Sequence, residues 1–170
     1  MKETPQQYTQ RILGYMAGQQ PLEVLAATPN KLERLTKGVS AAELRKHPAS
    51  EKWSVNEIAA HLAEGEIVSG FRIRFILGSP GSAVVAYDQD QWVISGHYDK
   101  RDPQNSVELF RAVREANLAL LASLEPEQWE HFGMHSERGR ESIECIVRMM
   151  AGHDINHLQQ IEKILLPSDL

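Results

Sequence analysis

The sequence predicts an all-α fold: a four-helix bundle with a long crossover between the second and third main helices, formed by a single domain over residues 1–170. Three observations support this prediction. Apolar residues recur at spacings of three and four, as on one face of a helix, in four long stretches at 22–37, 54–77, 106–124 and 141–165. Short turn-forming segments join most of these stretches. One connection, 82–104, is long and lacks such a period, and four helices joined in this way are typical of a bundle.

The chain begins with a shorter helical stretch at 4–16, where Pro5 suits the first turn. The first main helix follows at 22–37 and contains Thr28 and Pro29. Because the residue before a proline avoids helical geometry, we expect a break or kink at this point. The sequence therefore predicts a first main helix that is broken or kinked at this proline.

Capping signals mark the starts of the next elements. Ser40 and Glu43 form a capping box that opens a short turn, and Ser54 with Glu57 forms a second one before the second main helix. A Gly-Ser-Pro-Gly segment at 78–81 ends that helix. The second main helix therefore has a start and an end that can be predicted from the sequence.

The crossover at 82–104 is predicted to be irregular. Residues 83–87 resemble a strand in composition, but we expect no partner strand, because 131–140 is predicted to be a loop. Connections of this length are uncommon in compact domains and often have a function. The crossover is therefore a place to look for functional residues, and Tyr87 is a candidate within it.

The last predicted helix, 141–165, carries two histidines on one face. Ser142 is its candidate N-cap, and Pro167 is expected to end it. His153 and His157 stand four residues apart, which is about one helical turn. Two imidazoles placed in this way can direct their nitrogens at one metal ion.

His61, in the second main helix, is the candidate third ligand, because neighbouring apolar residues place it near the buried side. Three histidines with an open position describe a catalytic zinc-type site, although imidazole also binds nickel, copper and iron. The alternative is that these histidines are hydrogen-bonded polar residues near a bundle core. His131 and His135 also stand four apart, but helical spacing does not apply in the loop predicted there.

The composition excludes several classes of protein. A net charge of −5 without a basic cluster argues against nucleic-acid binding. No apolar run is long enough to span a bilayer, and residues 1–4 do not lead into a signal-peptide core. The single cysteine, Cys145, excludes an internal disulfide and suits a reducing cytoplasm. We expect a cytoplasmic protein that acts on a small molecule rather than on nucleic acid or a membrane.

Several other residues have both structural and functional interpretations. Glu64 is a candidate metal ligand, partner of a ligand or general base, although a solvated glutamate is more common at such a position. Asp154 and Asn156 are expected to face solvent or to cap neighbouring groups. Trp53 precedes a helix N-cap, where packing as a hydrophobic staple is its expected role. Cys145 is expected to be a small buried hydrophobe.

From about Pro21 to Leu165 the sequence resembles the DinB-like (YfiT-like) family of metal-dependent proteins. The resemblance rests on the motifs Trp53-Ser54, His61-Leu62, Glu66 and His153-Asp-Ile-Asn-His157-Leu-Gln-Gln-Ile161, and it extends to residues 87–90 in the crossover. It implies a four-helix bundle, a metal held by His61, His153 and His157, and frequent homodimers. Where relatives commonly carry aspartate, this chain has Glu64 followed by Gly65.

Three functions follow as expectations. The first is a transferase that uses a divalent metal ion, zinc or nickel, and a low-molecular-weight thiol such as bacillithiol or mycothiol, as the resemblance implies. A coordinated thiol is deprotonated, and Glu64 or Tyr87 would orient the second substrate. The second is a metal-dependent hydrolase in which Glu64 acts as the base. The third is a non-catalytic dimeric bundle with a binding or stress-associated role.

Overall fold

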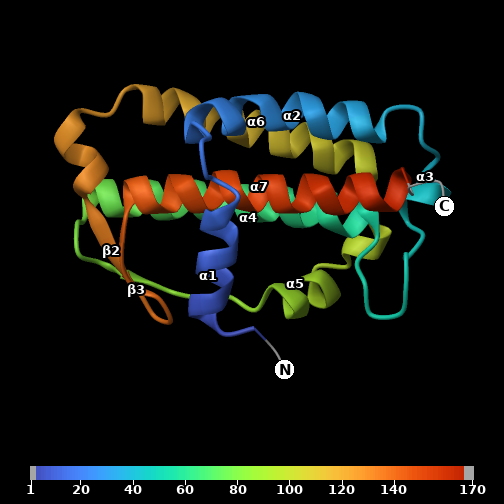
Figure 1. Ribbon diagram of the computed structural model, residues 1–170, viewed down its shortest axis with the longest axis horizontal. Helices are drawn as coiled ribbons and strands as arrows, with labels where there is room; N and C mark the ends of the chain where they lie inside the picture. Colours follow the sequence, from blue (N-terminus) through green and yellow to red (C-terminus); the bar gives the residue numbers. More distant parts are fainter. Residues whose placement is uncertain (1–2, 167–170) are drawn as a thin grey trace.

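The computed structural model describes residues 3–166, and its four long helices form the predicted bundle (Figure 1). Pro167, the expected helix stop, lies outside the described residues. The long helices are α2 (Pro21–Thr36), α4 (Val55–Gly78), α6 (Pro103–Ala122) and α7 (Ile143–Leu165). The shorter elements are α1 (Pro5–Gly14), α3 (Ala41–Leu44), β1 (Ala83–Val84), α5 (Gln89–Ser95), η1 (Tyr98–Lys100), η2 (Pro126–Glu130), β2 (Phe132–His135) and β3 (Gly139–Ser142). The predicted fold class is confirmed.

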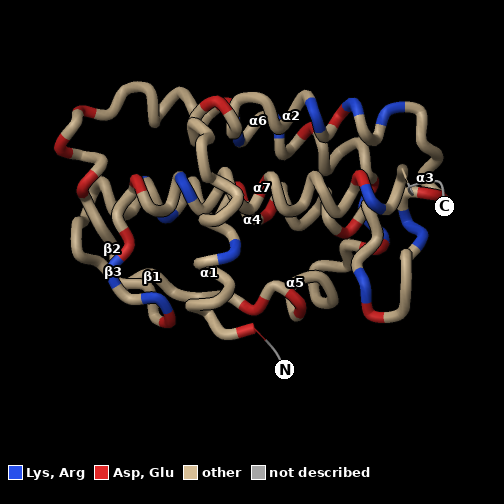
Figure 2. The backbone as a smooth tube through the Cα atoms, in the orientation of Figure 1, with Lys and Arg blue, Asp and Glu red and all other residues tan. Residues whose placement is uncertain are grey.

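Each long helix packs against two others, so that the order around the bundle is α4, α6, α2, α7. Helix α1 packs across α7 (Figure 1). Two large groups of buried apolar side chains fill the interior, one centred on α7 and α4 near the β-strands and the other toward α3, and a smaller third group joins α4 to the crossover. Acidic and basic residues are interspersed along the helices (Figure 2), and in residues 3–166 no helix has both the length and the apolar character to cross a membrane.

Side-chain caps fix where the site-bearing helices begin. The Ser54 hydroxyl accepts from the Glu57 backbone N–H while the Glu57 carboxylate accepts from the Ser54 backbone, which is the predicted capping box. The Ser142 hydroxyl accepts from the backbone N–H of Cys145 at the start of α7. Asp102 caps α6, so this helix begins earlier than the apolar period indicates.

The predicted break at Pro29 is wrong, because α2 continues through this residue. Proline has no N–H, so the Leu25 carbonyl, four residues earlier, has no partner within the helix. The Arg114 guanidinium of α6 donates to this carbonyl at 2.9 Å. A side chain from another helix thus replaces the missing backbone hydrogen bond.

The predictions of a loop at 131–140 and of an unpaired strand-like segment at 83–87 are also wrong. Strands β2 and β3 form an antiparallel hairpin, and β1 pairs in parallel with β2, Val84 opposite His135. Gly133 permits this approach, since a Cβ on it would lie 2.5 Å from a Val84 methyl group. The small sheet anchors the crossover beside the start of α7.

Candidate metal centre

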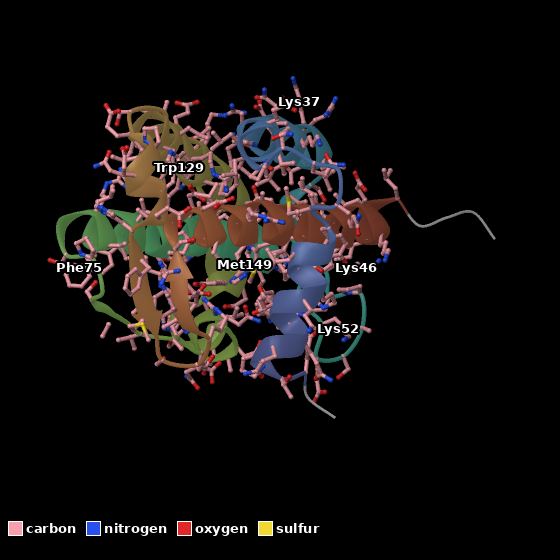
Figure 3. All side chains as sticks on the ribbon, turned by 60° about the vertical axis from the view of Figure 1, so that its left-hand side comes forward. Lys37, Lys46, Lys52, Phe75, Trp129 and Met149 are labelled. Atoms are coloured by element: carbon pink, nitrogen blue, oxygen red, sulfur yellow. The ribbon has the colours of Figure 1, made fainter. Side chains whose placement is uncertain are left out.

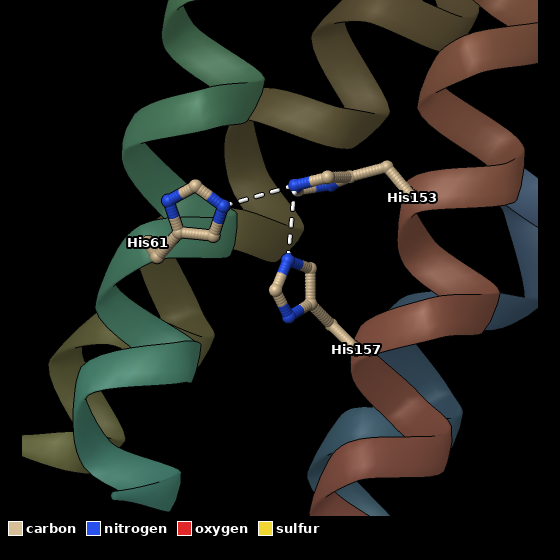
Figure 4. A group of neighbouring side chains, drawn as sticks. All are labelled: His61, His153 and His157. Carbon is tan, nitrogen blue, oxygen red and sulfur yellow. Dashed lines mark hydrogen bonds between the residues drawn. The ribbon is translucent and has the colours of Figure 1, made fainter. Parts of the chain in front are cut away.

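Three histidine rings converge between α4 and α7 (Figure 4). The Nε2 atom of His61 lies 2.9 Å from Nε2 of His153, which in turn lies 3.1 Å from Nε2 of His157. One candidate ligand atom from each ring lies within 4.8 Å of the other two. The structure therefore brings together the three histidines that the sequence singled out, and each comes from the helix predicted to carry it.

The donor set fits a divalent metal ion. Three imidazoles around a tetrahedral zinc ion at about 2.0–2.1 Å would have their nitrogens about 3.3 Å apart, close to the shorter separations observed here. Burial lowers the pKa of His61 and His153 well below the ordinary value and that of His157 to about 4. The rings are therefore neutral near pH 7, and each has a lone pair for a metal.

Two neighbours orient and shield the rings. The Oε1 atom of Gln160 lies 2.8 Å from Nδ1 of His157, so the proton of this ring sits on Nδ1 and its Nε2 lone pair faces the centre. The Trp53 ring packs 4.9 Å from the His61 ring and 6.3 Å from the His157 ring, nearly parallel to the latter. Trp53 thus packs, as predicted, and the imidazoles are among its contacts.

Other candidate residues lie outside this cluster. Arg101 donates to the Glu64 carboxylate at 2.5 Å, and Glu64 is not in the group of converging ligand atoms. His131 precedes β2 and His135 is buried in it, and four residues of extended chain span roughly 13 Å, too far for two ligands of one ion. Cys145 is half-buried at the start of α7, and burial raises the pKa of its thiol.

The expectation that Asp154 faces solvent is wrong, because it is buried in an ion-pair network. Arg114, whose side chain is 1% exposed, donates to Asp154 at 2.7 Å and to Glu66 at 2.7 Å. Asn117 also donates to the Glu66 carboxylate at 2.7 Å. Burial raises the pKa of Asp154, and the adjacent positive charge of Arg114 opposes this shift. Since Asp154 follows His153 directly, the network fixes the segment of α7 that carries the histidines.

Sequence reasoning missed Arg114, although a signal was present. Arg114 stands four residues after Phe110 and seven before Leu121, so it occupies the buried stripe of α6. A charged residue on such a stripe indicates buried partners on facing helices. Asn156, by contrast, accepts from Arg11 at 2.9 Å, which ties α7 to α1.

A cavity of about 460 Å³ adjoins the histidine cluster, with His153 in its wall. It lies between α1 and the β2–β3 hairpin, on the side of α7 that carries Met149 (Figure 3). Tyr87 also lines the cavity. The centroid of its ring lies 4.5 Å from the centroid of the Trp92 ring and 5.7 Å from Cζ of Arg72. The crossover therefore contributes to the cavity, as its length indicated.

Gly65 forms part of the wall where the cavity meets the histidines. A methyl group on Gly65 would lie 3.7 Å from the Tyr87 hydroxyl and 4.0 Å from Cε1 of His153. The absence of a side chain on this turn of α4 leaves room between Tyr87 and His153. A ligand in the cavity can thus approach His153 at this point.

Comparison with known proteins places these features in context. A sequence model of the DinB superfamily matches residues 25–161, a span that contains all three histidines. A protein of Oceanobacillus iheyensis, provisionally named a metal-dependent hydrolase, is 24% identical over 142 residues, 83% of this chain and 81% of its own. A similarly named protein of Halalkalibacterium halodurans is 22% identical over 145 residues, 85% of this chain and 84% of its own.

The fold also matches a solved structure. YfiT from Bacillus subtilis, described as a probable metal-dependent hydrolase with an unusual four-helix bundle topology, superposes with a TM-score of 0.80. The match covers 85% of this chain and 83% of YfiT at 22% identity. At this identity the likeness supports the fold, and the site must be judged on its own geometry.

Proposed function

Because this chain belongs to the DinB superfamily, we propose that it is a metal-dependent hydrolase of a small molecule, with a divalent ion held by His61, His153 and His157. The observation that carries the proposal is the convergence of three neutral imidazoles, one of which, His153, lies in the wall of a cavity of about 460 Å³. The names of the relatives, which refer to metal-dependent hydrolysis, support it.

Each residue around the centre has a role in this proposal. A bound divalent ion supplies a Lewis acid that lowers the pKa of water at the open position. Gln160 keeps the proton of His157 on Nδ1, and the Trp53 ring packs against the rings of His61 and His157. Tyr87, whose hydroxyl lies beside Gly65, orients the substrate with its O–H. Zinc and nickel are the candidate metals because imidazole suits both.

Thiol transfer is the second candidate, and one observation favours it. Glu64, the candidate general base, is ion-paired with Arg101, and the converging group contains histidines alone. A thiol whose pKa is lowered by a metal reacts as a thiolate and needs no such base. The homodimer and the cytoplasmic location stay predictions.

A substrate screen with and without thiol distinguishes the two reactions. Protein stripped with a chelator and reloaded with zinc or nickel is incubated with ester, amide and phosphate substrates. Parallel reactions contain bacillithiol, mycothiol or glutathione and an electrophilic probe. Metal-dependent turnover without thiol is expected for a hydrolase, and turnover only with thiol would identify a transferase. His61→Ala is the negative control and His97→Asn, an exposed histidine outside the cluster, is the matched variant. Equal rates in these two variants would contradict both reactions.

Enlarging Gly65 should separate access to the cavity from metal binding. Gly65→Leu is expected to keep stoichiometric metal but to lower kcat/KM roughly 10- to 100-fold, because its side chain fills the space between Tyr87 and His153. Gly65→Ala, whose methyl makes only ordinary contacts, is the control and is expected to raise stability by about 0.5–1 kcal/mol. Metal analysis, steady-state kinetics and thermal unfolding check these results. An unchanged kcat/KM in Gly65→Leu would show that substrate does not approach through this opening.

A further inference from the structure

One arginine in the cavity wall has no carboxylate partner within residues 3–166. Arg72 of α4 donates to the Val85 carbonyl at 2.6 Å and packs over the Tyr87 ring, but no carboxylate in that range lies within ion-pair distance. The other two arginines of the wall are paired, Arg114 with two carboxylates, Glu66 and Asp154, and Arg138 with one, Glu141. A half-buried guanidinium without a counter-ion is costly unless a ligand supplies one.

The same wall contains a buried donor that has no hydrogen-bond partner among the described residues. His135 is 3% exposed, and its Nδ1 accepts from the backbone N–H of Glu137 at 3.2 Å. The ring proton therefore lies on Nε2, which has no hydrogen-bond partner among the described residues. Such buried donors in native proteins call for an explanation, and an absent ligand is one.

The three buried carboxylates of the wall balance its three arginines in number, but within residues 3–166 none of them lies within ion-pair distance of Arg72. All three already pair with arginine, as does Glu3, which pairs with Arg11. The two remaining carboxylates, Asp90 and Glu137, are exposed. They disfavour a second negative charge on a ligand, and neither lies within ion-pair distance of Arg72.

We propose that the substrate carries one carboxylate, which Arg72 binds with help from the Nε2 donor of His135, and that its apolar body lies against Ile146 and Met149. This proposal rests on the proposed function and adds a substrate class, a small organic monoacid. Arg72 lies seven residues after Gly65 on α4, which is about 10 Å along the helix. A molecule anchored at Arg72 can therefore reach His153 with its other end. Its single charge matches one guanidinium and one neutral N–H.

A pair of esters tests the subsite. The 4-nitrophenyl half-ester of adipic acid and 4-nitrophenyl hexanoate have acyl chains of the same length and differ in a terminal carboxylate. Wild-type protein is expected to prefer the half-ester in kcat/KM, and Arg72→Gln to lose roughly 10- to 100-fold on it with little change on hexanoate. Arg140→Gln removes an exposed charge from β3 outside the cavity and is expected to keep the preference. His135→Gln, which keeps a donor near the Nε2 position, should retain more of it than His135→Leu.

Calorimetric titration with hexanoate, a monocarboxylate, gives a readout that needs no turnover. Metal-loaded and chelator-treated wild-type protein are both expected to bind hexanoate, with roughly 10- to 100-fold weaker binding in Arg72→Gln. Binding that requires the metal and is unchanged in Arg72→Gln would overturn the proposal, because the carboxylate would then sit on the metal. Metal-dependent hydrolysis of both esters without preference would overturn the subsite but leave the proposed function intact. Hexanoate binding that depends on Arg72, without hydrolysis of either ester, would support the subsite and count against the hydrolase.

Discussion

Replacing His153 with alanine is expected to lower zinc affinity by more than about 100-fold. His153 is the central ring of the cluster, since its Nε2 lies within 3.1 Å of the Nε2 atoms of both His61 and His157. Loss of a residue that only orients a ligand typically costs 10- to 100-fold in affinity, so loss of a direct ligand should exceed this. Elemental analysis of purified protein and competition with a zinc indicator measure the effect.

Thermal unfolding provides an independent measure of the same loss. Zinc at about 100 times its dissociation constant should stabilise the wild type by about 2.7 kcal/mol and leave His153→Ala nearly unchanged. His97→Asn controls for the removal of an imidazole and should respond like the wild type. If His153→Ala retained one metal per chain and the full shift in Tm, the three histidines would not form a metal site.

Replacing Arg114 with methionine is expected to destabilise the protein by about 3–5 kcal/mol. The substitution leaves the carboxylates of Glu66 and Asp154 buried without their positive partner, which is the costly way to break a buried ion pair. It also leaves the Leu25 carbonyl without its donor. Urea unfolding measures the change in free energy. Arg111→Met on the same helix breaks an exposed pair with Glu33 and should cost less than about 1 kcal/mol.

A compensating variant identifies the cause of the loss. If the stranded charges are responsible, adding Glu66→Gln and Asp154→Asn to Arg114→Met should recover part of the stability, because neutral amides cost less to bury than carboxylates. A loss in Arg114→Met no greater than that in Arg111→Met would show that the network contributes little to the fold. No recovery in the triple variant would assign the loss to packing instead.

Much of the bundle could be predicted from local patterns. The apolar period located the four long helices, and the caps at Ser54 and Ser142 gave two of their starts. The spacing of His153 and His157 required one helical turn, and His61 lay near the buried side of its own helix. Local information was sufficient because each inference concerned residues within one helix.

The remaining features depend on partners far away in the sequence. The β1 strand has two residues and pairs with β2 about fifty positions later, so neither strand has a periodic signal of its own. Asp154 is polar and stands in a helix, which by itself indicates exposure, and only Arg114 on α6 explains its burial. The donors of Arg72 and His135 meet in one wall because the hairpin packs beside α4. Tertiary contacts overrode the local preferences at these positions.

Pro29 makes two distant positions interdependent. Any residue with an N–H at 29 would satisfy the Leu25 carbonyl inside α2, and Arg114 would then have one acceptor fewer for its guanidinium. Conversely, an apolar residue at 114 would leave the proline with its usual penalty in a helix interior. The effects on stability of substitutions at 29 and 114 are therefore not additive. Replacing the proline reduces the stability lost when Arg114 is also replaced. A residue known for interrupting helices here leaves a carbonyl free for a hydrogen bond that joins α2 to α6.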